Sequence, residues 1–267
     1  MNGHSDDSPL YEALDRPEVL TRLFHPRPEM PLNRTAESGI DVTIRVDPGV
    51  EIGGRFHAAH PAGGNILFFH GNGEIVADYD ELGTVYNRMG INFLPVDYRG
   101  YGRSSGSPSV SAMMHDAHVI LDFVLQWLEE KEFTGPLVVM GRSLGSASAL
   151  DLARKRAGDI AGLIVESGFA YAGPLLRLLG IDTAAIGLRE TDGFGNLDKI
   201  ARFDKPTLII HAEYDHIIPF SDGERLYQAC PADRKNFLKI PGANHNDIFM
   251  RGLDAYLQHV KALVESL

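Results

Sequence analysis

The sequence is poor in cysteine and has no long apolar run. Cys230 is its only cysteine, so the 267-residue chain cannot form an intrachain disulfide, and nothing in it demands an oxidising compartment. No stretch approaches the roughly 20 apolar residues that a membrane helix needs. The polar start from Met1 to Pro9 lacks the apolar centre of a signal peptide. We therefore expect a soluble, cytoplasmic protein with no membrane span.

The sequence also lacks the spacing patterns of common metal and phosphate sites. It has no H-E-x-x-H motif, no cysteine pair and neither of the glycine-rich phosphate loops, G-x-G-x-x-G and G-x-x-x-x-G-K-[ST]. Its net charge of −11 disfavours a polyanion binder. We expect no metal, no cofactor and no nucleic-acid partner, and the sequence leaves the oligomeric state open.

Short apolar strands alternate with helical stretches over most of the chain. The apolar content of 44% and the charged content of 23% are ordinary for a soluble globular protein, and the length suits one α/β domain. An antiparallel start followed by continuously apolar strands predicts a mostly parallel sheet with helices on both faces. The predicted strands are 41–46, 49–57, 65–69, 91–96, 137–140, 163–165, 207–210 and 237–240, and the predicted helices are 79–89, 113–131, 147–157, 221–230 and 248 to the end.

Two segments fall outside this alternation. Residues 1–38 are rich in proline and charge and predict an N-terminal arm, whose segment 20–28 we expect to pack its Leu and Phe side chains on the main body. Residues 171–200 lie between two predicted strands but contain more than one helix needs, which indicates a small cap insertion. We expect 1–267 to form a single domain that carries both additions.

A nucleophile elbow is predicted at Ser143. The motif G-x-S-x-G occurs at 141–145, directly after an apolar strand and directly before a helical run, which is the strand–turn–helix context that lifts a serine above a sheet. A second match at 102–106 places Ser104 in a loop rich in glycine and serine, where turn formation explains the residues. We therefore predict Ser143 as the reactive serine.

Two later loops contain an acid and a base in the chain order that this elbow requires. Asp215 follows the strand 207–210, and His245 follows the strand that ends at 240, so both lie at carboxyl ends of strands, where open α/β sheets bind ligands. A histidine there can take the serine proton and return it to a leaving group, while the acid holds the correct tautomer.

Other side chains compete for these two roles. Glu213 and Asp222 are alternatives for the acid. Among the eleven histidines, His211 lies in a predicted strand, His216 comes too early in the chain order, and His259 lies on the terminal helix. His245 is therefore the predicted base.

The turn His70-Gly71-Asn72-Gly73 follows the strand 65–69 and indicates an oxyanion hole. Glycines allow backbone N–H groups to approach a ligand closely. We predict the backbone N–H groups of Asn72 and of Leu144, the residue after the nucleophile, as the two donors. The alternative is a glycine turn with no ligand.

Five segments in chain order resemble the α/β-hydrolase superfamily, and within it the single-domain group that includes the ABHD-type serine hydrolases. The resemblance covers about residues 40–260, and it implies an eight-stranded sheet with an antiparallel second strand and the reactive serine after strand five. It also implies that the loop 97–106 shapes the pocket floor. Ala212 departs from the glycine common before the acid, which alters the loop without threatening Asp215. The segments are 70–73, 96–106, 141–145, 215–219 and 242–247.

These motifs predict hydrolysis of a carboxylic ester or thioester through an acyl-serine intermediate, with a small-molecule acyl ester or thioester as the substrate. The alternatives are another triad reaction on the same fold, such as perhydrolysis or C–C bond cleavage, and a binding or signalling module without catalysis.

For the substrate pocket we predict His70, Gly71 and the cap residues Leu175, Leu178 and Leu179, which helical spacing places on one face. An apolar cap would favour short-to-medium acyl esters over acetyl esters. The opposing interpretation is that this face packs on the core.

Overall fold

The computed structural model describes residues 11–30, 39–188 and 193–267. Eight strands form one sheet in the order β1-β2-β4-β3-β5-β6-β7-β8. Strand β2 pairs antiparallel with β1 and β4, and the other neighbours are parallel, as the resemblance implies. The strands are β1 Ile40–Asp47, β2 Val50–Phe56, β3 Asn65–Phe69, β4 Asn92–Val96, β5 Leu137–Arg142, β6 Gly162–Glu166, β7 Thr207–Ala212 and β8 Lys235–Ile240.

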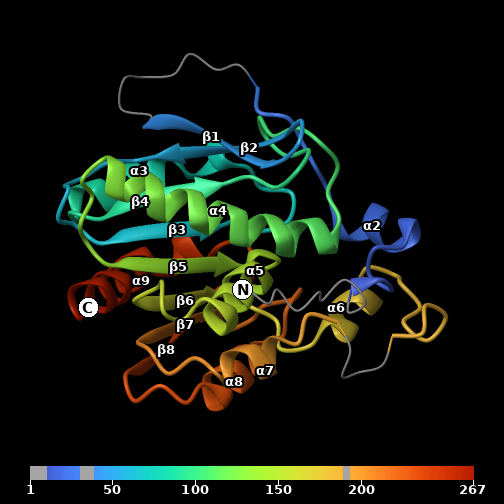
Figure 1. The fold of residues 1–267 in the computed structure, drawn as a ribbon. Helices are drawn as coiled ribbons and strands as arrows, with labels where there is room; N and C mark the ends of the chain where they lie inside the picture. The colour runs from blue at the N-terminus through green and yellow to red at the C-terminus, as the bar shows by residue number, and fades with distance from the viewer. Residues whose placement is uncertain (1–10, 31–38, 189–192) are drawn as a thin grey trace.

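The predicted α/β-hydrolase fold is confirmed, and the period of two along the strands explains its two cores. Leu67 and Phe69 of β3 belong to one buried cluster, and Ile66 and Phe68 belong to the other, because successive side chains of a strand point to opposite faces. The first cluster includes buried residues of α4, α5 and α8, and the second includes residues of α3 and α9. Figure 1 shows α4 along the sheet in the first of these layers.

The helices agree in place with the sequence-based prediction but differ at their ends. The predicted helix 79–89 is a 3₁₀ turn followed by a short α-helix, and the terminal helix is kinked at Gly252, where a Cβ would come within 2.7 Å of the Ile240 side chain. The helical elements are α2 Pro17–Leu23, η1 Val76–Tyr79, α3 Asp80–Arg88, α4 Val110–Glu130, α5 Gly145–Lys155, α6 Ala172–Leu178, α7 Asn196–Ile200, α8 Phe220–Ala229 and α9 Ile248–Glu265.

The predicted N-terminal arm contains α2 and packs on the main body. Val19, Leu23 and Phe24 are buried, and Leu20 is partly buried against the same core, as expected for the segment 20–28. Residues 1–10 and 31–38 of the predicted arm lie outside the described residues. In Figure 1, α2 lies next to α6, beyond the ends toward which the arrows of β5 and β6 point.

The segment between β6 and β7 contains α6 and α7, and residues 189–192 of the predicted cap lie outside the described residues. The expected face of α6 needs a correction. Leu176 is the fully buried leucine, whereas Leu178 is 58% exposed, and Leu175 and Leu179 pack partly buried against the core. Leu179 is the C-cap of α6, and its backbone N–H donates to the Leu175 carbonyl at 3.1 Å, so Leu175 and Leu179 share a face that Leu178 does not.

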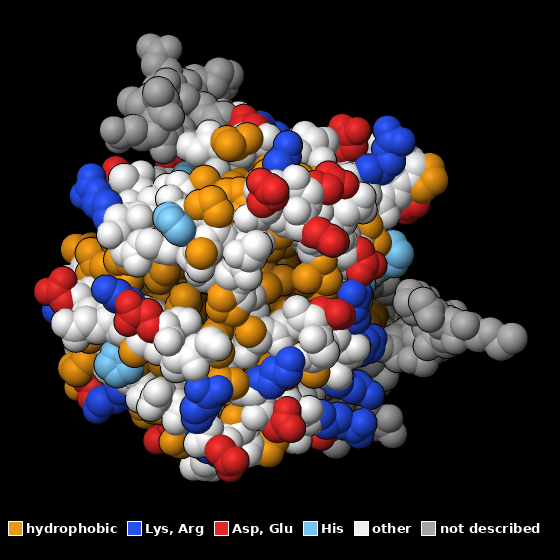
Figure 2. Space-filling view, turned by 60° about the vertical axis from the view of Figure 1, so that its left-hand side comes forward, with side chains coloured by type: hydrophobic (Ala, Val, Ile, Leu, Met, Phe, Trp, Pro, Cys, Tyr) orange, Lys and Arg blue, Asp and Glu red, His pale blue; other side chains and the backbone are white. Residues whose placement is uncertain are grey.

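The surface carries exposed apolar atoms between charged groups. Figure 2 shows a band of apolar side chains across one face, with acidic and basic side chains above and below it. Folded proteins commonly expose this much apolar surface, so the band by itself does not indicate a docking site. In the part of the chain that the structure describes, no helix is long and apolar enough to span a bilayer.

Candidate active site

Ser143 lies on a strained turn between β5 and α5. Its backbone φ is +51°, a conformation that residues other than glycine rarely adopt. A Cβ on Gly141 would come within 2.3 Å of the Gly145 carbonyl oxygen, and one on Gly145 within 2.1 Å of the Phe69 carbonyl oxygen. Both positions of the motif therefore require glycine, because neighbouring backbone atoms lie too close for a Cβ. This tight turn places the serine at the end of the central strand.

Ser143, His245 and Asp215 form a hydrogen-bonded chain. The Oγ of Ser143 lies 3.1 Å from Nε2 of His245, and Nδ1 of the same ring lies 2.7 Å from Oδ2 of Asp215. An ionised carboxylate can only accept, so Nδ1 carries the proton that it donates to Asp215. That tautomer leaves Nε2 free to accept the Ser143 hydroxyl proton, which is the arrangement that a general base requires.

The loop after β7 holds Asp215 ionised. Its Oδ1 accepts the backbone N–H groups of Ile217 at 3.0 Å and Ile218 at 2.8 Å, while Oδ2 faces His245. Burial by itself would raise the pKa of Asp215, but the hydrogen bond from His245 and the backbone bond from Ile218 outweigh it and lower the pKa. Both carboxylate oxygens are therefore occupied, which fixes the orientation of the group.

The competing acids have other partners. Glu213 accepts from Nζ of Lys239 and from the backbone N–H of Gly242, each at 2.9 Å. Asp222 accepts the backbone N–H of Ala170 and pairs with Arg225. Neither carboxylate shares a hydrogen bond with His245 among the described residues.

The competing histidines and the second serine are also held elsewhere. His211 is buried and donates from Nε2 to the Ile218 carbonyl, and burial lowers its pKa. His259 donates from Nδ1 to the Ala255 carbonyl within α9. His216 is exposed. The hydroxyl of Ser104 accepts the Gly53 N–H at 2.9 Å, so it belongs to a turn, as expected.

The two candidate oxyanion donors lie in the loops expected for them. Leu144 is the N-cap of α5, and Asn72 lies in the loop after β3. Across residues 11–30, 39–188 and 193–267, no hydrogen bond takes the backbone N–H of either residue. The N-terminus of α5 also adds a positive partial charge at Leu144, which favours a developing anion.

The predicted pocket roles of His70 and Gly71 need correction. The His70 ring is fully buried, donates from Nδ1 to the Gly71 carbonyl at 2.8 Å and packs edge-on against Tyr98. The Gly71 N–H donates to Oε2 of Glu74 at 2.6 Å. Both residues therefore stabilise the loop that carries Asn72, and the His70 side chain is buried within it.

Arg142, the residue before the candidate nucleophile, makes a buried ionic hub that sequence reasoning missed. Its Nε donates to Glu74 at 2.9 Å, its Nη1 to Glu166 at 2.6 Å and its Nη2 to the backbone carbonyl of His245 at 3.0 Å. It thus joins the oxyanion loop, β6 and the histidine loop. The sequence did contain one signal for this cluster: Arg142 is a charged residue at the end of an apolar strand, and a buried charge needs partners.

The carboxylates around Arg142 are fully engaged. Oε2 of Glu74 accepts both the Gly71 N–H and the Tyr79 hydroxyl, and Oε2 of Glu166 accepts the Tyr256 hydroxyl at 2.8 Å. Burial opposes ionisation of Glu74, yet the Arg142 charge and the Tyr79 hydroxyl outweigh it and lower the pKa of Glu74 to about 2. The pair of Arg142 and Glu74 is therefore ionic at neutral pH.

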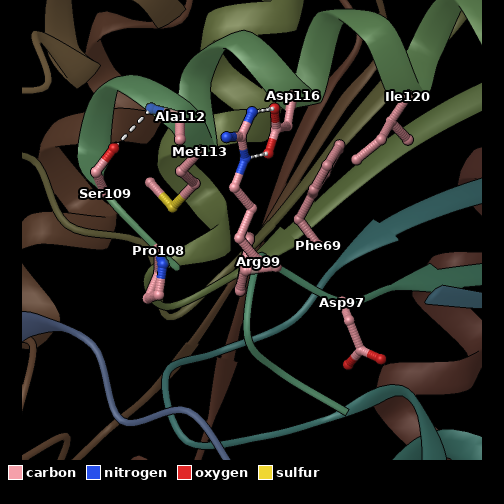
Figure 3. A pocket seen from close by; sticks show the side chains of 10 residues that line it. Phe69, Asp97, Arg99, Pro108, Ser109, Ala112, Met113, Asp116 and Ile120 are labelled. Carbon is pink, nitrogen blue, oxygen red and sulfur yellow. Dashed lines mark hydrogen bonds and ion pairs between the residues drawn. The ribbon is translucent and has the colours of Figure 1, made fainter. Parts of the chain in front are cut away.

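A cavity of about 10 Å³ lies between the start of the loop 97–106 and α4, and Figure 3 shows the residues that line it. Asp116 holds Arg99 there through two bonds of 2.7 Å, and Ser109 caps α4 by accepting the Ala112 N–H. This volume suits about one water molecule. The described residues that line it include no member of the Ser143 chain, so it belongs to the packing of the loop. The role of this loop as the pocket floor stays a prediction.

No metal site accompanies this arrangement in the described ranges, where no group of three or more His, Cys, Asp or Glu side chains is placed to hold an ion. The chemistry that these residues can perform themselves is proton transfer from Ser143 to His245 and stabilisation of an anion by backbone N–H groups.

Comparisons with known proteins identify the family of the chain. A family model described as "Serine aminopeptidase, S33" matches residues 60–185. The chain is 31% identical over 210 residues to alpha/beta hydrolase domain-containing protein aho-3 of Caenorhabditis elegans, covering 75% of this chain. It is 30% identical over 217 residues to the protein Rv2307c of Mycobacterium tuberculosis, covering 79% of this chain and 73% of that protein. The chain belongs to the α/β-hydrolase superfamily.

The fold of this α/β hydrolase is also that of a solved esterase. The Pyrococcus furiosus esterase Pf2001 superposes with a TM-score of 0.71 at 16% identity, covering 91% of this chain and 99% of that one. This α/β hydrolase spans 57% of the length of aho-3.

Proposed function

We propose that the protein is a serine hydrolase that cleaves carboxylic ester or thioester bonds through an acyl intermediate on Ser143. The observation that carries the proposal is the hydrogen-bonded chain from Ser143 through His245 to Asp215, at 3.1 and 2.7 Å, on a turn with a φ of +51° at the serine. The esterase relationship of the fold supports an ester substrate.

The first half of the reaction acylates the serine. His245 Nε2 takes the Ser143 hydroxyl proton as Oγ attacks the acyl carbon, and the carbonyl oxygen becomes an oxyanion. The backbone N–H groups of Asn72 and Leu144 stabilise that anion, each donor contributing on the order of 3 kcal/mol to the barrier. The C–O or C–S bond then breaks, and His245 returns the proton to the leaving alcohol or thiol.

Water completes the cycle. It gives a proton to His245 and attacks the acyl carbon, and the second tetrahedral intermediate releases the carboxylic acid while Ser143 regains its proton. Throughout, Asp215 stabilises the imidazolium and keeps its own charge. The residues of the chain supply every proton transfer, and the proposal needs no cofactor.

A pre-steady-state assay tests the proposal. Purified protein mixed with p-nitrophenyl esters and acyl thioesters of graded chain length should release a burst of leaving group of about one equivalent per active site, followed by slower turnover. No burst and no turnover with any oxoester or thioester would contradict it and favour a binding or signalling module. Turnover that requires added hydrogen peroxide would point instead to perhydrolysis.

A further inference from the structure

The N-terminal segment 11–30, here called the strap, crosses the carboxyl edge of the sheet. It lies outside residues 60–185, which the family model matches. Figure 1 shows its helix α2 beside α6 on the side of the sheet to which the strands point. Open α/β sheets bind ligands at this edge, so the strap lies where a substrate would approach.

The strap is anchored along its length rather than resting loosely on the surface. Asp15 accepts the backbone N–H groups at the start of α4, from Val110 at 2.7 Å and Ser111 at 3.2 Å. Arg22 donates from Nη1 to the carbonyl of Leu179, just after α6, at 3.0 Å. Five of its apolar side chains are buried in the main core: Tyr11, Leu14, Val19, Leu23 and Phe24.

Beyond α2, the strap clamps the side chain of Asn72. Oδ1 of Asn72 accepts the His25 backbone N–H at 2.9 Å and the Tyr101 hydroxyl at 2.7 Å. Its Nδ2 donates to Nδ1 of the His25 ring at 2.8 Å. Because Nδ1 must accept this bond, the ring proton of His25 lies on Nε2. The carboxamide therefore has its partners on both atoms, and it can take only one orientation.

The next strap residues hold the neighbour of Asn72. Arg27 donates from Nε to the Gly73 carbonyl at 2.7 Å, and its Nη2 pairs with Asp78 in the turn that follows. Glu29 continues the strap and pairs with the buried Arg55 at 2.7 Å. Two consecutive residues of the candidate oxyanion loop are thus fastened by the strap, one through its side chain and the other through its backbone.

We propose that two residues of the strap, His25 and Arg27, are positioning residues for the oxyanion loop. The inference rests on the proposed function, because it assigns the Asn72 N–H to the transition state. A donor aids catalysis when it is already oriented before charge develops, and a misplacement of about 1 Å can cost on the order of 100-fold in rate. The strap supplies this fixed orientation from outside the sheet.

A double variant separates positioning from general stability. His25 and Arg27 are exposed, so His25→Ala/Arg27→Ala removes little packing. We expect kcat for a p-nitrophenyl ester to fall about tenfold with KM within about twofold of wild type, because the transition state loses more than the bound substrate. The single variant His25→Ala should lose part of this rate. His25→Asn, whose side-chain oxygen can accept the same Asn72 amide hydrogen, should keep most of it.

Thr21→Ala is the matched control, because its exposed hydroxyl bonds within the strap, to the Pro17 carbonyl. It should keep the wild-type kcat. A double variant with wild-type kcat would overturn the proposal. So would a loss of kcat in Thr21→Ala equal to that of the double variant and accompanied by a lower Tm, because general destabilisation would then explain both losses.

Hydrogen exchange provides a readout independent of turnover. Amides of the segment 71–74 should exchange faster in the double variant than in wild type and Thr21→Ala, because local opening costs less when the clamp is absent. Unchanged exchange would overturn the clamp itself. If wild type hydrolysed no ester, the proposed function would fail, and the exchange comparison would still decide whether the strap holds this loop.

Discussion

The Nη2 atom of Arg142 donates a hydrogen bond of 3.0 Å to the backbone carbonyl of His245. The residue beside the candidate nucleophile therefore holds the loop that carries the candidate base, across 103 positions of sequence. The same guanidinium also reaches Glu74 behind the oxyanion loop. One buried cation thus contacts the loops that carry the candidate base and the candidate anion donor Asn72, next to the candidate nucleophile.

Replacing Arg142 with lysine tests this coupling. Lysine keeps the charge but lacks the rigid fork that reaches three partners, so Arg142→Lys should lower kcat on the order of 100-fold with little change in KM. Steady-state kinetics measure the split. Arg156→Lys is the control, because Arg156 lies just after α5 and pairs with Asp122 and Asp159. It should keep the wild-type kcat. An unchanged kcat in Arg142→Lys would remove the positioning role.

Replacing Asp215 with asparagine tests the acid assignment. The amide would favour the wrong tautomer of His245, so Asp215→Asn should lower kcat on the order of 10⁴-fold. Glu213→Gln removes a carboxylate only two residues away that pairs with Lys239, and it should stay near wild type. Should the two variants behave the other way round, the acid would be Glu213.

The ion pair of Glu74 predicts how stability depends on pH. The pKa of Glu74 is lowered from 4.5 to about 2 in the folded protein, so the stabilisation is fully present above about pH 5 and is lost as the pH falls toward 2. Its size at neutral pH is on the order of 3 kcal/mol. Urea unfolding of wild type and Glu74→Gln should show a difference in stability that shrinks between pH 5 and pH 2.5. A constant difference over that range would contradict the ion pair.

The leucines of α6 and its end should separate stability from specificity. Leu176 is fully buried, so Leu176→Ala should destabilise the protein by about 2 to 5 kcal/mol, whereas Leu178→Ser, at an exposed position, should change stability by less than about 0.5 kcal/mol.

If Leu178 and Leu179 contact the acyl chain, wild type should gain roughly fourfold in kcat/KM per added methylene over short esters. The double Ser variant should flatten that profile. A flat profile in wild type would assign α6 to the core alone.

Much of the fold followed from local patterns. The strand 65–69 was predicted with its observed bounds, because four consecutive apolar residues between turn residues are typical of a strand in a parallel sheet. The helix ends and the break between η1 and α3 were not predictable from periodicity, because hydrogen bonds such as Val76 N–H to the Asp97 carboxylate set them. Such contacts join residues far apart in the chain.

The candidate triad was predictable because chain order and strand ends place three residue types at one edge. The role of Arg142 was not predictable, because the motif allows any residue before the serine. The three partners of Arg142 lie 68, 24 and 103 positions away in the chain. His70 and Leu178 were assigned to the pocket from their positions along the chain. The buried hydrogen bond of His70 and the 58% exposure of Leu178 depend on side-chain directions, which sequence spacing does not determine.

Covalent labelling tests most directly whether Ser143 is the nucleophile. Wild type, Ser143→Ala and Ser104→Ala are each incubated with a fluorophosphonate, and the adduct is located by mass spectrometry of peptides. We expect one adduct, on Ser143, in wild type and Ser104→Ala. Ser143→Ala should show none, together with a loss of kcat on the order of 10⁶-fold. Labelling that survives in Ser143→Ala and disappears in Ser104→Ala would contradict the account.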